Sequence, residues 1–103
     1  MEQNQTITKT GVRYKDRSPQ MYDVIMHNDD VTTMEFVVMV LEKVFQKNRT
    51  EAVEIMLDIH NNGKAVAGTY TYDIAHSKAD KATSMARASK FPLMLTVHPK
   101  KEN

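Results

Sequence analysis

Two stretches of this chain carry polar side chains whose types and spacing could do chemistry. Asn28, Asp29 and Asp30 follow a short apolar segment, and His60 stands directly before Asn61-Asn62-Gly63. Carboxylate oxygens and an imidazole nitrogen can bind a metal ion, so Asp29, Asp30 and His60 form one conceivable metal site. The same residue types also form turns and cap helices. Residue types alone therefore leave a turn, a helix end and a metal site open.

The signatures of enzyme active sites are absent from the sequence. It has no cysteine, no pair of histidines around a glutamate at zinc-protease spacing, no glycine-rich phosphate loop and no nucleophile elbow. The acidic stretch at 28–30 lacks the glycine and the terminal glutamate of a calcium-binding loop. His27, His76 and His98 show no pairing and are expected to be structural or exposed. The sequence predicts a protein that is not an enzyme and has no cofactor, with a metal-dependent hydrolase as a rival interpretation.

Short apolar segments and helical periodicity predict the elements that must position these residues. Apolar runs bounded by turn formers are typical of strands, and apolar residues that recur every three to four positions are typical of helices. The expected order is a strand at 22–27, a helix with apolar positions from 34 to 45, a helix from 50 to about 60, a strand within 64–72, a helix over about 73–89 and a strand at 93–97. This β-α-α-β-α-β order predicts an α+β fold, with helices packed on one face of a three-stranded sheet.

Capping signals predict where the first two helices begin. Thr32 and Glu35 have the spacing of a capping box, in which each side chain accepts a hydrogen bond from the other residue's backbone N–H. Thr50 is expected to cap the second helix, and the residues at 61–63 are expected to end it. The third helix carries small residues on one face, which predicts close packing on the sheet.

Length and charge predict one domain with flexible ends. A chain of 103 residues has room for a single domain, expected at 20–99, with a flexible arm at 1–19 and a tail at 100–103. The net charge of +1 argues against a nucleic-acid partner. No apolar run approaches the roughly 20 residues that cross a bilayer, and the first ten residues lack a signal peptide's apolar segment. The expected location is the cytoplasm.

Several separated motifs together resemble one family. Residues 24–30, Thr32 and residues 34–37 resemble the "NDDxTxMEFV" signature of the ClpS family, the bacterial adaptors of the Clp protease. Residues 55–64 resemble that family's "MLxxHxxGK" segment, and residues 67–71 and Pro92-Leu93 also fall where the family has them. The resemblance runs over about residues 20–97.

This resemblance implies how the chain would recognise a substrate. Members of the family bind proteins that begin with Phe, Tyr, Trp or Leu, and by position Asn28, Asp29 and His60 would hold the substrate's α-amino group. An ammonium has three donors and no acceptor, and a carboxylate, an amide oxygen and a neutral imidazole supply acceptors. The first side chain would enter a hydrophobic pocket formed by Thr32 at the rim, Met34, Val37, Met56, Ile59 and Leu93.

The resemblance also implies a partner. The family delivers its substrates to an AAA+ Clp unfoldase, by contact with the N-terminal domain of a ClpA-like protein and with help from the mobile N-terminal arm. Asp73 and Lys78 occupy the matching places in this chain. Neither a nucleic acid nor a membrane is expected as a partner.

The chain departs from the family pattern at four positions. Val31 stands where an aromatic residue is frequent, Thr33 where proline is frequent, Phe91 where histidine is frequent, and Asp58 replaces a small residue. The amine-binding residues are unchanged, and the preference between leucine and aromatic residues stays open. The main rival function is a ribosome-associated module, because a ribosomal stalk-protein domain has a similar α+β fold, and that rival rests on fold analogy alone.

Overall fold

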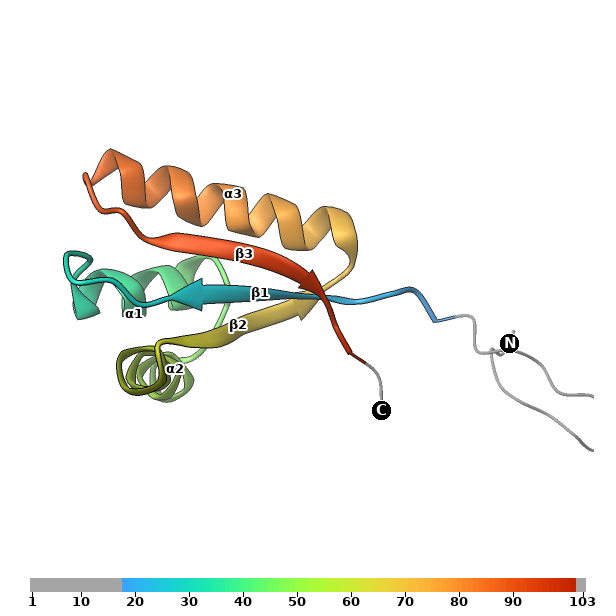
Figure 1. The fold of residues 1–103 in the computed structure, drawn as a ribbon, viewed down its shortest axis with the longest axis horizontal. Helices are drawn as coiled ribbons and strands as arrows, with labels where there is room; N and C mark the ends of the chain where they lie inside the picture. Colours follow the sequence, from blue (N-terminus) through green and yellow to red (C-terminus); the bar gives the residue numbers. More distant parts are fainter. Residues whose placement is uncertain (1–17, 102–103) are drawn as a thin grey trace, which may run out of the picture.

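A computed structural model describes residues 18–101 and contains the six elements in the expected order (Figure 1). Most of the predicted arm at 1–19 and the last two residues of the predicted tail lie outside the described residues. The elements are β1 (Tyr22–His27), α1 (Met34–Lys43), α2 (Arg49–Asn62), β2 (Lys64–Tyr70), α3 (Tyr72–Ala88) and β3 (Met94–Pro99). The predicted α+β class and β-α-α-β-α-β order are confirmed.

Strand β1 lies at the centre of a three-stranded antiparallel sheet. The strand order is β2-β1-β3, so the first strand pairs with both later ones. Val24 and Met26 of β1 are fully buried on one face, whereas Asp23, Ile25 and His27 point to the other face and are partly exposed. Helix α3 contacts all three strands, and Figure 1 shows it running alongside β3. The burial pattern therefore agrees with helices packed on one face.

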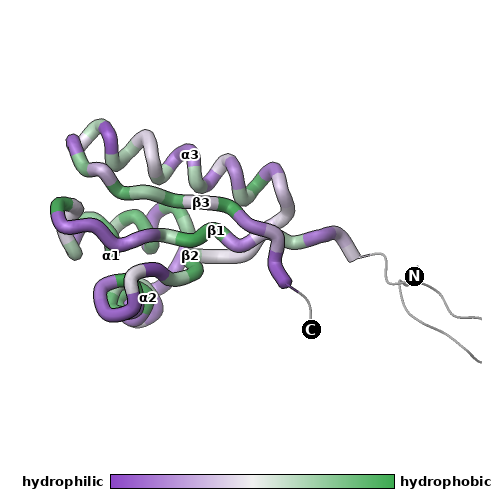
Figure 2. The backbone as a smooth tube through the Cα atoms, in the orientation of Figure 1, coloured by the Kyte–Doolittle hydropathy of each residue, from purple (hydrophilic) through white to green (hydrophobic). Residues whose placement is uncertain are grey.

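The core is built from branched side chains of α1 and small side chains of α3. Val40 and Leu41 of α1 are completely buried, and each such aliphatic side chain contributes about 1.5–3 kcal/mol. Helix α3 presents a row of alanines to the sheet, which lets it approach closely, as the sequence predicts: Ala75, Ala79, Ala82 and Ala86. Figure 2 shows the resulting alternation of hydrophilic and hydrophobic segments along α3. Among residues 18–101, no helix is long and apolar enough to cross a membrane.

The caps of the first two helices differ from the prediction. Thr33, not Thr32, caps α1, and its Oγ1 accepts from the Phe36 N–H at 3.1 Å. The N–H and the hydroxyl of Thr32 both donate to Asp29, so Thr32 belongs to the loop that precedes the helix. The capping box lies instead at α2, where Asn48 and Glu51 bond reciprocally, so the expected cap at Thr50 was also wrong. Both helices begin within two residues of the predicted caps.

Gly63 ends α2 and starts the return into the sheet. Its φ of 93° lies in the left-handed region, and its N–H donates to the Ile59 carbonyl at 2.9 Å. Its own carbonyl accepts from the Asn28 N–H at 2.8 Å, which ties the end of β1 to the end of α2. A side chain here would meet nothing within 4 Å, so any cost of substitution comes from backbone conformation rather than from crowding.

We expect Gly63→Ala to lower the free energy of unfolding by about 1–2 kcal/mol, because an L-residue with a Cβ disfavours positive φ. Urea denaturation followed by circular dichroism measures this loss. Gly63→Asn is the matched control, and it should lose less because asparagine tolerates the left-handed region. Equal losses in the two variants would contradict a conformational origin.

Candidate ligand-binding site

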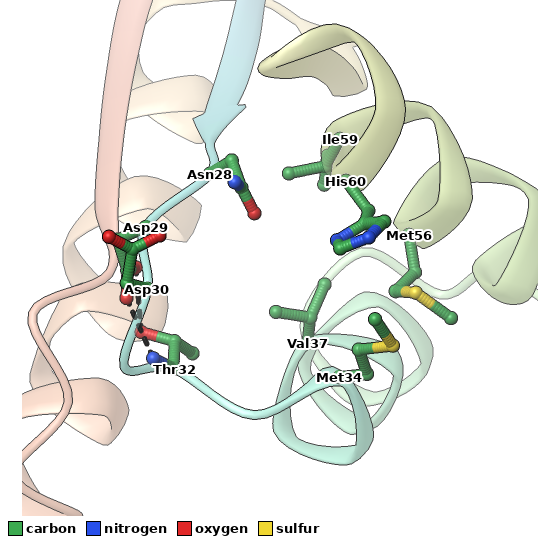
Figure 3. Close-up of a pocket in the computed structure, with 9 residues that line it drawn as sticks. All are labelled: Asn28, Asp29, Asp30, Thr32, Met34, Val37, Met56, Ile59 and His60. Carbon is green, nitrogen blue, oxygen red and sulfur yellow. Dashed lines mark hydrogen bonds between the residues drawn. The ribbon is translucent and has the colours of Figure 1, made fainter.

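A cavity of about 250 Å³ opens between the loop after β1 and the facing sides of α1 and α2. Drug-sized ligands occupy pockets of about 300–1,000 Å³, so this cavity suits a single amino-acid side chain. Nine residues line it, and Figure 3 shows them around one opening: Asn28, Asp29, Asp30, Thr32, Met34, Val37, Met56, Ile59 and His60. Polar and apolar side chains thus share one small space.

The loop from 28 to 33 is folded around the Asp29 carboxylate. One of its oxygens accepts from the backbone N–H groups of Val31 at 2.8 Å and Thr32 at 2.7 Å, and the other accepts from the Thr32 hydroxyl at 2.8 Å. Figure 3 draws the bonds between Asp29 and Thr32. A carboxylate has about four lone-pair positions, so three loop donors leave room for about one donor from a ligand.

The same hydrogen bonds keep Asp29 ionised. Partial burial alone raises the pKa of the carboxyl, but the bonds from Thr32 and Val31, with the nearby charge of Arg87, outweigh burial and hold the pKa below the ordinary value of 3.8. Asp30 lines the cavity next to it. None of the lining residues is a lysine or an arginine, so this end of the cavity favours a cationic group.

Helix α2 supplies the opposite wall. Met56, Ile59 and His60 line the cavity because residues three and four positions apart share a helix face. In Figure 3 the side chains of Asn28 and His60 point toward the same space from opposite sides. The Asn28–Gly63 backbone bond fixes how far apart these two walls lie.

The apolar part of the cavity is both pocket wall and core. Val37 is 6% exposed and Ile59 is 3% exposed, so their side chains are packed into the protein and present only one surface to the cavity. Met34, at 44% exposed, lies at the mouth. Methionine side chains are flexible, so Met34 and Met56 can adjust to an occupant while Val37 and Ile59 cannot.

The cavity brings together the residues that the sequence analysis grouped, with two differences. Leu93 is buried in the core, only 1% exposed, and is not among the lining residues. Asp30 does line the cavity, although the family resemblance assigns it no role in substrate binding; its place in the Asn-Asp-Asp motif was the available signal. Asp73 and Lys78 lie on α3, away from the lining residues.

The metal interpretation finds no support in the geometry. Within residues 18–101, no three His, Cys, Asp or Glu side chains are grouped closely enough to hold a metal ion. Asp29 already accepts three hydrogen bonds within its own loop, which leaves about one acceptor position. The donor set of the cavity fits an organic cation better than a metal.

None of the four departures from the family pattern is among the residues that line the cavity. Thr33 caps α1, and Val31 is 58% exposed on the loop. The Phe91 ring packs edge-on against Phe36, with ring centroids 5.0 Å apart. Asp58 is exposed on α2. These four side chains therefore form no part of the inner surface of the cavity.

Comparisons with a family profile, with curated proteins and with solved structures all identify the same family. The family profile described as "ATP-dependent Clp protease adaptor protein ClpS" matches residues 17–96. The ClpS adapter of Myxococcus xanthus is 46% identical over 93 residues, which cover 90% of this chain and 87% of that protein. The ClpS adapter of Acetivibrio thermocellus is 48% identical over 94 residues, covering 91% and 95% of the two chains.

A solved structure shares the fold. The structure of Agrobacterium tumefaciens ClpS2 bound to L-phenylalaninamide aligns with a TM-score of 0.77 and 38% sequence identity, covering 81% of this chain and 100% of that chain. The family profile covers most of the chain, and both relatives align over nearly their whole length. The chain therefore belongs to the ClpS family of ATP-dependent Clp protease adaptor proteins, and it is an adaptor rather than an enzyme.

Proposed function

We propose that this chain binds proteins that begin with a bulky hydrophobic residue, Phe, Tyr, Trp or Leu, and delivers them to an AAA+ Clp unfoldase. The observation that carries the proposal is one cavity that joins an apolar floor to a cation-favouring rim. A free N-terminal residue combines the same two features, an ammonium group and a side chain on one carbon atom. The Agrobacterium ClpS2 structure holds L-phenylalaninamide, which carries both features.

Asn28, Asp29 and His60 would hold the substrate's ammonium group. Asp29 is ionised and retains about one acceptor position, while the Asn28 amide oxygen and a neutral His60 nitrogen can accept the remaining donors. Hydrogen bonds to a charged group contribute about 1.5–3 kcal/mol each. Two or three such bonds distinguish a free N-terminus from a blocked or internal residue.

The first side chain would bind against Met34, Val37, Met56 and Ile59, with Thr32 at the rim; Leu93 would support these walls from the core. An aromatic side chain buries about 150–250 Å², which at about 25 cal/mol per Å² is worth about 4–6 kcal/mol. Association itself costs about 4–15 kcal/mol. Neither the amine nor the side chain suffices alone, so the adaptor requires both.

Delivery would use the start of α3. We include Asp73, which is exposed in its first turn, and Lys78 in a contact with the N-terminal domain of a ClpA-like unfoldase. The Lys78 ammonium donates to the Val44 carbonyl and to Gln46 Oε1, both at 2.7 Å. These bonds hold the side chain in place and use two of its three donors, which leaves one for a partner. The arm at 1–19 would assist the transfer.

Acetylation of the N-terminus is the first test. A peptide beginning with free Phe should bind more than about a hundredfold tighter than its acetylated form, because at least two charged hydrogen bonds are lost. Isothermal titration calorimetry measures both affinities. A Gly-initiated peptide with a free amine is the control for the side-chain half and should also bind weakly. Equal affinities for the free and acetylated peptides would contradict the amine site.

Met34 is expected to exclude β-branched first residues, whose second γ-group lies close to the backbone at the cavity mouth. Met34→Ala should raise the affinity of Ile- and Val-initiated peptides relative to a Phe-initiated one by about tenfold. Fluorescence anisotropy gives the ratio. Met39→Ala is the matched control, because Met39 does not line the cavity and lies in a neighbouring groove that also includes Met34 and Met56. An unchanged Ile-to-Phe ratio in Met34→Ala would exclude Met34 as the selective residue.

The pH dependence of peptide affinity distinguishes the contribution of His60 from that of Asp29. Because the pKa of Asp29 is depressed, its negative charge is fully present above its ordinary value of 3.8 and is lost only as the pH falls through the lower folded value. Weakening between pH 7 and 5 is then not expected from Asp29, whereas an imidazole that gains a proton ceases to accept. We expect His60→Ala to bind more weakly at pH 7 and to show a flatter acid limb. A variant that keeps the wild-type acid limb would place the titrating group elsewhere.

A further inference from the structure

The face of the sheet that points away from Val24 and Met26 has no part in the cavity described above. Antiparallel pairing puts partner residues on the same face, so the register assigns nine side chains to it. They form three rows across the sheet, His98-Asp23-Thr69, Thr96-Ile25-Val66 and Met94-His27-Lys64. We call these nine residues the open face.

The centre of the open face is apolar and accessible. Val66 is 43% exposed and Met94 is 55% exposed, and Ile25 lies between their strands on β1. Hydrophobic side chains gathered on one surface mark a site of interaction more often than isolated ones do. Burying these side chains under a partner would be favourable.

Positive charge surrounds this apolar centre. A groove of about 450 Å³ on the open face is lined by Asp23, Ile25, Lys64, His98, Pro99, Lys100 and Lys101. Its three lysines face one carboxylate, and Asp23 already accepts a hydrogen bond from the Thr69 hydroxyl at 2.6 Å. The whole chain carries a net charge of only +1, so this face is more positive than the molecule as a whole.

Two histidines lie on the same face and share one hydrogen-bond partner. The Nε2 atoms of His27 and His98 lie 2.8 and 2.9 Å from the Thr96 Oγ1, so His27 is part of the hydrogen-bonded sheet surface, and His98 is exposed, as expected of a structural or exposed histidine. A threonine hydroxyl can accept two hydrogen bonds, so this arrangement tolerates protonation of both rings. Burial, followed by the charges of Lys64 and His98, lowers the pKa of His27.

We propose that the open face binds an acidic, extended peptide segment of a partner protein. Its carboxylates would lie against Lys64, Lys100 and Lys101, and its alternate apolar side chains would cover Ile25, Val66 and Met94. A segment of about six extended residues spans about 20 Å, the length of β1. The apolar centre favours a peptide over a nucleic acid, because a nucleic-acid backbone needs cations along its path and gains little from Val66 and Met94.

This surface is separate from the N-terminal binding cavity. No residue lines both the cavity and the groove on the open face. The adaptor could therefore hold a substrate N-terminus and an acidic segment at the same time. Failure of one proposal leaves the other intact, and the two are tested with different peptides.

The probe is the peptide acetyl-Gly-Glu-Val-Glu-Leu-Glu-Val-Glu with fluorescein near its C-terminus, measured by fluorescence anisotropy on the full chain. Acetylation keeps it out of the amine site. We expect saturable binding that weakens as salt is raised. The double variant Lys64→Glu/Lys100→Glu should bind about tenfold or more weakly, while its affinity for a Phe-initiated peptide stays at the wild-type value.

Three controls test the contribution of charge, the contribution of apolar contacts and the location of the probe on the protein. The double variant Lys43→Glu/Lys81→Glu changes the net charge equally on exposed helix positions and should bind the probe within about twofold of wild type. The double variant Val66→Ser/Met94→Ser should have a lower affinity for the probe, but an unchanged affinity for a Glu-Ser peptide of the same charge. In ¹⁵N–¹H correlation spectra, the probe should shift the amides of Ile25 and Thr96 and leave that of Asn28 unmoved.

Three results would overturn the proposal. The first is no saturable binding of the probe to the wild-type chain. The second is equal loss of affinity in the open-face and helix charge variants, which would indicate only a general charge effect. The third is tighter binding of a short oligothymidine or of phosphatidylserine vesicles than of the probe, which would assign the face to another class of anion.

Discussion

The binding cavity depends on the hydrogen bond from the Asn28 N–H to the Gly63 carbonyl. It continues the β1–β2 ladder one step past the last pair, His27 and Lys64, and joins the acidic loop to the end of α2. Each residue of an α-helix turns the chain by about 100°. If α2 ended one residue later relative to this bond, His60 would therefore be rotated away from Asn28. The left-handed conformation of Gly63 fixes that end point. Two polar segments far apart in the sequence become one site through this short connection.

Asp29 shows that the turn and binding interpretations of the Asn-Asp-Asp motif do not compete. Its carboxylate organises the loop through Val31 and Thr32, as a turn-forming aspartate does. The same bonds lower its pKa and hold the charge in place before any ligand arrives. Positioning the charge in advance reduces the ordering cost of binding. A loop built for its own stability thus supplies a fixed acceptor.

Periodic features of the sequence predicted the fold, and features that depend on tertiary contacts were missed. The elements and the alanine face of α3 follow from apolar spacing. Thr32 and Thr33 are both able to cap a helix, and the sequence does not show which of them does. The choice depends on the tertiary structure, in which Thr32 is hydrogen-bonded to Asp29 and Thr33 accepts from Phe36. The pairing of His27 with His98 through Thr96 needs the strand register. The cavity residues came from family resemblance rather than from spacing, and Leu93 shows that position in a motif does not reveal which way a side chain faces.

The division of the cavity wall between rigid and adaptable residues constrains how its specificity can change. Val37 and Ile59 are nearly buried, so altering them would leave a hole in the core as well as in the pocket. Met34 is largely exposed and lies at the mouth, where a change costs little stability. The side of the cavity proposed to bind the amine is held by backbone geometry at Gly63 and by the loop around Asp29. The proposed recognition of a free N-terminus is therefore tied to the fold, whereas the proposed choice among first side chains rests on residues that can vary without unfolding the protein.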